Sequence, residues 1–86
     1  MPASTPSTVT VRYFAAARAA AGLAEEYVEA GTVRDALTAI RDRHGARLGR
    51  ILDCCSFLLD GHAVHDDSAA LGASAQLDVL PPFAGG

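Results

Sequence analysis

The chain has 86 residues, half of them hydrophobic, and a formal net charge of −3. This length fits one small domain, and we take residues 1–86 as a single unit. The seven basic residues are arginines scattered between Arg12 and Arg50, without the basic patch that nucleic-acid binding needs, and no apolar run approaches the ~20 residues of a membrane span.

The N-terminal half alternates strand and helix patterns. Residues 1–7 are polar and rich in Ser, Thr and Pro, and we expect them to be disordered. Thr8 to Phe14 alternates apolar and polar side chains, which predicts a half-buried strand. The alanine-rich segment from Phe14 to Gly22 favours a helix that ends at the glycine. Leu23 to Ala30 predicts a second strand that pairs with the first and carries three glutamates on a solvated face: Glu25, Glu26 and Glu29.

The main helix is predicted between Thr32 and Gly45. Thr32 is a typical N-cap residue, and Asp35 follows it three positions later, as in a short capping box. An apolar stripe at helical spacing comes next, and basic residues complement the C-terminal dipole before Gly45 ends the helix. The stripe consists of Val33, Ala36, Leu37 and Ile40, and the basic residues are Arg41, Arg43 and His44.

A short helical turn or an irregular packed segment is predicted at residues 48–52, where Leu48, Ile51 and Leu52 are apolar. Phe57 to Leu59 predicts a compact strand, because Asp60-Gly61 after it is a hairpin-turn signal. Ala63-Val64 then predicts a short return strand.

The chain ends in one more predicted strand and a tail. Leu71 is expected as a single buried anchor, and Gln76 to Leu80 alternates as a strand does. Pro81 and Pro82 end this strand because they lack amide donors, so residues 81–86 are expected to form a flexible tail. The order of elements predicts an α+β fold, with one main helix packed on a mixed sheet of four to five strands.

Two clusters carry metal-binding or nucleophilic residue types. His62, His65, Asp66 and Asp67 follow the predicted hairpin turn, and we interpret them as a solvated loop that binds no metal. Cys54 and Cys55 are adjacent, a poor geometry for a disulfide, which favours the reducing cytoplasm. One thiol is expected to point inward and the other outward, with no base beside them. We expect no bound cofactor and no active site of the chain's own.

The terminal Gly85-Gly86 is the feature that most suggests chemistry. Glycine has no Cβ, so such a tail can enter a narrow cleft and leave its carboxyl group unhindered. By itself the same pattern also fits a frayed terminus.

Two motifs at opposite ends of the chain resemble one family. Pro81-Pro82-Phe83-Ala84-Gly85-Gly86 resembles the P-P-V-A-G-G end of the molybdopterin synthase small subunits, which are ubiquitin-like β-grasp sulfur carriers. Phe14 to Gly22 resembles that family's F-A-x-x-R-E-x-x-G segment. Ala19 and Phe83 depart from the pattern, where the family has Glu and Val. The resemblance covers Thr8 to Gly86 and implies a β-grasp fold.

The resemblance also implies a non-catalytic, sulfur-donating subunit. A ubiquitin-activating-like adenylyltransferase would use ATP to form an acyl-adenylate on Gly86, and a sulfur donor protein would lead to a C-terminal thiocarboxylate. The tail would insert into the large subunit of molybdopterin synthase, in a heterotetramer of two small and two large subunits. Sulfur would pass to a pyranopterin precursor of the molybdenum cofactor.

Site residues follow from the same resemblance. Gly86 would carry the reactive carboxylate, and Gly85 and Ala84 would thread into the partner. The partner-binding residues would be Phe83, Leu80, Arg18 and Phe14. Two alternatives stay open, a sulfur carrier for thiamine or cysteine synthesis and a ubiquitin-like protein modifier. A thiamine or cysteine carrier would keep the diglycine but is not expected to keep the segment from Phe14 to Gly22.

Overall fold

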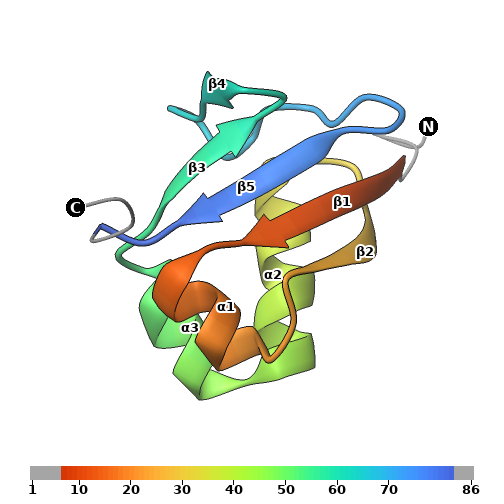
Figure 1. The fold of residues 1–86 in the computed structure, drawn as a ribbon. Coiled ribbons are helices and arrows are strands. Elements are labelled where there is room, and N and C mark those ends of the chain that lie inside the picture. Colours follow the sequence, from red (N-terminus) through yellow and green to blue (C-terminus); the bar gives the residue numbers. More distant parts are fainter. Residues whose placement is uncertain (1–6, 83–86) are drawn as a thin grey trace.

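The computed structural model describes residues 7–82, which form three helices and five strands (Figure 1). In chain order these are β1 (Ser7–Tyr13), α1 (Ala15–Ala21), β2 (Glu25–Ala30), α2 (Val33–His44), α3 (Ala46–Leu52), β3 (Ser56–Leu59), β4 (His62–Ala63) and β5 (Gln76–Leu80).

The predicted elements are present, with small shifts at their ends. Ser7 is the first residue of β1, whereas we expected it in a disordered start; residues 1–6 lie outside the described part. The return strand is His62–Ala63, one residue earlier than predicted. The segment around Leu48 is a regular helix, α3. Among residues 7–82, no helix combines the length and apolar character that a membrane crossing requires.

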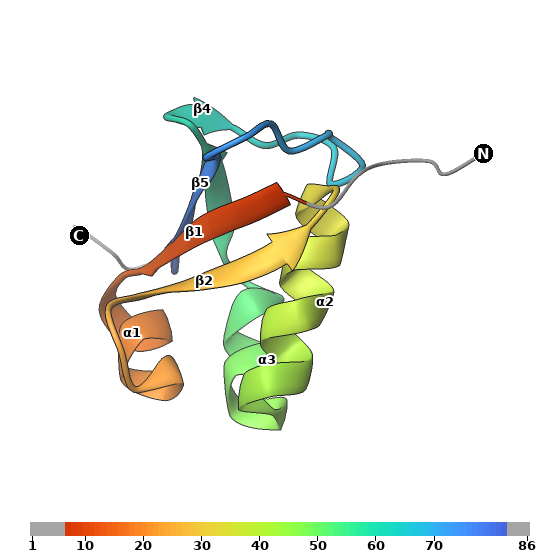
Figure 2. The same cartoon turned by 90° about the vertical axis from the view of Figure 1, so that its right-hand side faces the viewer.

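The five strands form one mixed sheet in the order β2-β1-β5-β3-β4. The two central strands, β1 and β5, are parallel, and each of the other neighbouring pairs is antiparallel. All three helices lie on one face of the sheet, and the opposite face is left uncovered by any helix (Figure 2). The α+β arrangement with one main helix, α2, is therefore confirmed.

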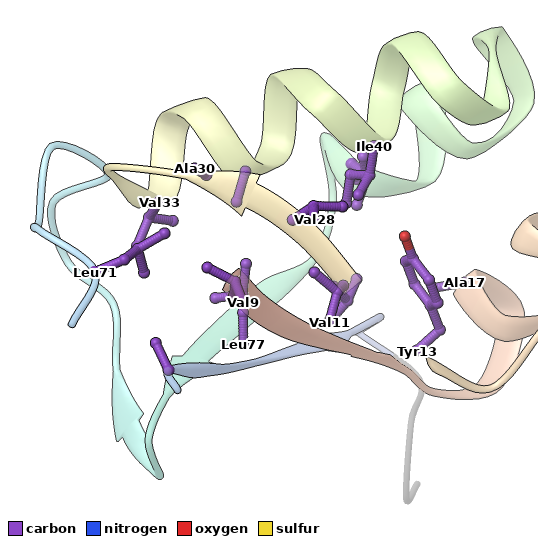
Figure 3. Close-up of a cluster of buried hydrophobic side chains, with 14 of the residues drawn as sticks. Val9, Val11, Tyr13, Ala17, Val28, Ala30, Val33, Ile40, Leu71 and Leu77 are labelled. Carbon is purple, nitrogen blue, oxygen red and sulfur yellow. The ribbon is translucent and has the colours of Figure 1, made fainter. Parts of the chain in front are cut away.

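The core lies between the sheet and the helices (Figure 3). β1 supplies alternate residues to it, as its period of two predicted, and α2 supplies residues at helical spacing. Leu71 is buried in the same cluster, which confirms the predicted anchor. The buried hydrophobic side chains of the core include Val9, Val11, Tyr13, Val28, Val33, Ile40, Leu48, Leu52, Leu77 and Val79.

Local sequence signals fix the ends of these elements. Gly22 ends α1 in the left-handed region at φ +81°, and its amide donates to the Arg18 carbonyl at 2.9 Å. The Thr32 hydroxyl accepts the Asp35 amide at 3.1 Å and so caps α2. Asp60 and Gly61 both have positive φ, as the tight turn between β3 and β4 requires.

One prediction about β2 is wrong: Glu26 does not share the solvated face of Glu25 and Glu29. Its side chain is only 9% exposed and lies between the sheet and the end of α2. The Tyr13 hydroxyl donates to one carboxylate oxygen, which His44 Nε2 also contacts, and Arg43 binds the other at 2.7 Å. Alternation along β2 turns Glu26 inward, on the same face as Val28.

The cluster around Glu26 controls its ionisation. Desolvation favours the neutral acid, but the hydrogen bonds from Tyr13, Arg43 and His44 outweigh it and hold the pKa of Glu26 below its ordinary value. Burial and the bond to Glu26 raise the pKa of Tyr13. The ionised carboxylate thus joins β1, β2 and the C-terminal turn of α2.

Replacing Glu26 with Gln should lower the free energy of unfolding by about 1–3 kcal/mol, because it removes the charge to which Arg43 and His44 bind at a side chain that is only 9% exposed. Glu25→Gln is the matched control one residue away on the exposed face, and it should cost less than about 0.5 kcal/mol. Urea denaturation of the two variants at neutral pH measures the difference.

The pH dependence of this loss has a definite sign. Because the pKa of Glu26 is lower in the folded state than its ordinary value of 4.5, ionised Glu26 stabilises the fold at pH values above 4.5. This stabilisation is lost as the pH falls through the pKa of the folded state. The difference in free energy of unfolding between wild type and Glu26→Gln should therefore become smaller at acid pH. A difference that stays constant, or equal losses for the two glutamine variants, would contradict the assigned role of Glu26.

Candidate docking site at the exit of the last strand

The C-terminal segment leaves the fold from the centre of the sheet. β5 lies between β1 and β3, and the Phe14 amide donates to the Val79 carbonyl at 3.2 Å, next to the strand's end. Pro81 is buried and Pro82 is exposed. Four predicted site residues lie outside the described part of the chain: Phe83, Ala84, Gly85 and Gly86. The structure therefore defines the point from which this segment starts.

An ion pair lies on the uncovered sheet face just before this exit. Arg12 on β1 and Asp78 on β5 are register partners, and the guanidinium binds both carboxylate oxygens, at 2.9 and 3.2 Å. Asp78 is only 7% exposed, although the uncovered face is otherwise open. The hydrogen bond and charge of Asp78 raise the pKa of Arg12. Two-point binding fixes both side chains in one geometry.

Apolar side chains surround this ion pair. The Arg12 guanidinium lies over the Phe14 ring, 5.5 Å from its centre. Leu58 is the register partner of Asp78 on β3, and Leu80 follows Asp78 by two residues, so both share its face. We call Phe14, Leu58 and Leu80, with the Arg12–Asp78 pair, the exit patch.

The structure brings together two of the predicted partner-binding residues and separates a third. Phe14 and Leu80 belong to the exit patch. Arg18 is exposed on α1 and faces the loop that leads to β2. It lines a separate hollow with Ala15, Ala19, Gly22, Leu23 and Ala24.

A second surface lies on the helix side of the same exit. It is a groove of about 260 Å³ between α1 and α3, lined by apolar atoms alone. Arg50 therefore contributes its methylene stem to this lining, as long cationic side chains often do. The lining residues are Ala16, Arg50, Ile51, Cys54, Pro81 and Pro82.

The two cysteines differ as predicted. Cys54 is exposed, whereas Cys55 is half-buried and donates from its thiol to the Ile51 carbonyl at 3.1 Å. Burial, with a smaller effect of Cys54, raises the pKa of Cys55 to about 11. Cys55 is therefore a poor nucleophile near neutral pH.

Of the four residues predicted to form a solvated loop, His62 instead lies in strand β4, where it pairs with Leu59, and the other three follow that strand. Asp66 accepts from the amide and the hydroxyl of Ser68, at 2.9 and 2.7 Å, and these bonds hold its pKa below the ordinary value. Asp67 pairs with Arg34 at 2.7 Å. Within residues 7–82, no group of three or more His, Cys, Asp or Glu side chains converges as metal ligands would.

Comparison with known families identifies the fold's relatives. Residues 11–86 match the ThiS family. The chain belongs to the ThiS family. No match was found among curated protein sequences.

Solved structures of similar proteins agree with this assignment. Small archaeal modifier protein 1 from Methanosarcina acetivorans has a TM-score of 0.81 and 25% identity, over 94% of this chain and 98% of that one. A Pyrococcus furiosus protein assigned as molybdopterin converting factor subunit 1 has a TM-score of 0.79 and 27% identity, over 90% and 99%. The complex of molybdopterin-converting factor subunits 1 and 2 from Helicobacter pylori contains a chain with a TM-score of 0.71 and 24% identity, over 92% and 99%.

These likenesses confirm the predicted ubiquitin-like β-grasp fold. They also show that this ThiS-family chain shares its fold both with molybdopterin converting factor subunit 1 and with small archaeal modifier protein 1.

Sequence reasoning missed two parts of the exit patch, the Arg12–Asp78 pair and Leu58. Alternation did place Arg12 and Asp78 on the polar faces of their strands. Only the pairing of β1 with β5, however, shows that these opposite charges are neighbours. Leu58 was expected simply as part of a compact apolar strand.

Arg12→Met should lower the free energy of unfolding by about 1–3 kcal/mol, because it leaves the Asp78 carboxylate buried without its partner. Arg34→Met is the matched control, because it breaks an exposed ion pair in which the side chains of Arg34 and Asp67 are 65% and 45% exposed. It should lower the free energy of unfolding by at most about 1 kcal/mol. Thermal or urea unfolding measures both. Equal losses would mean that Arg12 and Asp78 act as an ordinary surface pair.

Proposed function

We propose that this chain is a sulfur carrier whose reactive group is the C-terminal carboxylate of Gly86. The observation that carries the proposal is the family match, which runs through Gly85 and Gly86 to the last residue. A carboxylate is a poor electrophile and needs activation. In the proposed cycle a partner adenylyltransferase joins the carboxylate to the α-phosphate of ATP, and pyrophosphate leaves. Sulfur at the oxidation level of sulfide, delivered by a donor protein, then attacks the acyl carbon and displaces AMP, which leaves a thiocarboxylate with no change of oxidation state.

In this proposal the chain supplies a docking surface and a C-terminal tail that enters the active sites of its partners, and the partners supply the catalytic groups. The exit patch suits the docking role, because its apolar side chains lie where the tail starts and the Arg12–Asp78 pair on the same face holds its two charges in one geometry. Free Cys54 and Cys55 favour the reducing cytoplasm as its compartment.

We further propose molybdopterin synthesis as the pathway, with the carrier acting as small subunit of molybdopterin synthase. Its tail would insert into the large subunit, in an assembly of two small and two large subunits, and donate sulfur to a pyranopterin precursor. Two observations support this choice: the paired motifs at Phe14 to Gly22 and Pro81 to Gly86, and the likeness to molybdopterin converting factor subunit 1, including a copy solved with subunit 2.

A second candidate function is attachment to other proteins as a ubiquitin-like modifier. The likeness to small archaeal modifier protein 1, at a TM-score of 0.81, favours it. Both functions begin with the same acyl-adenylate on Gly86 and differ in the acceptor. Carriers for thiamine or cysteine synthesis share that first step too.

Deletion of Gly86 should abolish thiocarboxylate formation, because the reactive carbonyl must be that of the terminal glycine. Incubation with a cognate adenylyltransferase, ATP and sulfide should change the intact mass of the wild-type chain by one oxygen-to-sulfur exchange. Gly85→Val tests the narrow-cleft requirement, since a β-branched side chain both widens and stiffens the tail. An exchange of oxygen for sulfur in the Gly86-deleted chain would contradict the proposal.

Substitutions in the exit patch should weaken binding of the large subunit. Leu80→Ala and Phe14→Ala are each expected to cost about 1–3 kcal/mol of binding free energy, as moderate interface hot spots do. Tyr27→Ala is the matched control, because Tyr27 is 64% exposed on the same sheet face but lies on the edge strand β2. Calorimetric titration measures the dissociation constants. Losses no larger than that of Tyr27→Ala would remove the exit patch from the interface.

A further inference from the structure

The groove between α1 and α3 is not used by the proposed docking at the exit patch. Its lining is entirely apolar, and it opens beside Pro82, the last described residue. An apolar side chain that enters such a hollow removes hydrocarbon surface from water on both sides, which is favourable.

We propose that the groove is the seat of the side chain of Phe83, so that the free carrier holds the base of its own tail against α1 and α3. The covalent connection supports this occupant. Phe83 is bonded to Pro82, which lines the groove, and Pro81 is buried next to it. Both prolines have a restricted φ, which reduces the number of conformations open to the segment that leads to Phe83 and so lowers the entropy cost of docking.

The chemistry of the segment also selects Phe83. After Pro82 the chain continues Phe83-Ala84-Gly85-Gly86, so Phe83 has the only side chain there larger than a methyl group. A phenyl ring carries no polar atom, and the groove lining exposes none. Docking would therefore bury no polar group without a hydrogen-bond partner. Three residues remain beyond it, and they span at most about 10 Å.

Docking has a consequence for the carrier, and this consequence, unlike the docking itself, rests on the proposed function. A partner that draws Ala84, Gly85 and Gly86 into its own cleft must first pull Phe83 out of the groove. The docked form therefore keeps the tail close to the domain until a partner displaces the ring.

The exposed thiol of Cys54 lies in the groove lining and provides a direct readout. The test uses the full chain with Cys55→Ala, so that alkylation reports Cys54 alone. Phe83→Ala in this background should raise the alkylation rate of Cys54 by about tenfold, which corresponds to about 1.4 kcal/mol of docking free energy. Deletion of Gly85 and Gly86 is the matched control, because it shortens the tail but keeps Phe83, and it should leave the rate unchanged.

A second measurement does not depend on the cysteine. The chain has no tryptophan, so Phe83→Trp introduces a single fluorophore. We expect its emission at shorter wavelength, and less accessible to acrylamide, than that of Ala84→Trp one residue further along.

Three results would overturn the proposal. Equal alkylation rates with and without the Phe83→Ala substitution would show that the ring does not cover Cys54, and matching emission from the two tryptophan variants would show that position 83 is in water. Protection of Cys54 that rises with protein concentration would assign the groove to a second copy of the chain. None of these results bears on thiocarboxylate formation at Gly86, so the two proposals fail separately.

Discussion

The first and last strands of the chain run side by side at the centre of the sheet, and the rest of the structure depends on that parallel pairing. It joins Arg12 to Asp78 across 66 residues of sequence, and it places Val11 and Leu77 together over the helices. Because the two strands are parallel, both end at the same edge. Phe14 and Leu80, from opposite ends of the chain, therefore become neighbours at the point where the C-terminal segment leaves.

This pairing also divides the exit into two surfaces of different character. On the uncovered sheet face, the exit patch combines apolar side chains with a two-point ion pair in which Asp78 is buried and Arg12 is partly exposed and lies over the Phe14 ring. On the helix face, the groove between α1 and α3 has an apolar lining, to which Arg50 contributes its methylene stem. A surface with oriented charges is suited to recognising a specific partner, whereas an apolar groove accepts any ring or aliphatic group of suitable size.

Local patterns in the sequence predicted most of the fold, and non-local contacts explain what was missed. The alternation around Val9 and Val11, the Thr32 cap and the glycine after α1 each act within a few residues, so they could be read directly. The inward position of Glu26 could not be predicted in this way, because it depends on contacts with Tyr13, Arg43 and His44 near the end of α2. The same holds for the exit patch, where Leu80 and Phe14 were predicted through the family resemblance and Leu58 required the β3–β5 register.

On this model of recognition, a partner binds the end of β5 and takes hold of the segment that follows it. Amide chemical shifts of the isotope-labelled chain, followed during titration with a cognate adenylyltransferase, report this binding residue by residue. We expect the largest changes at Phe14, Leu58 and Leu80 and along residues 83–86, with Tyr27 on β2 unchanged. Changes confined to β2 and α2, with the strand exit unaffected, would contradict it.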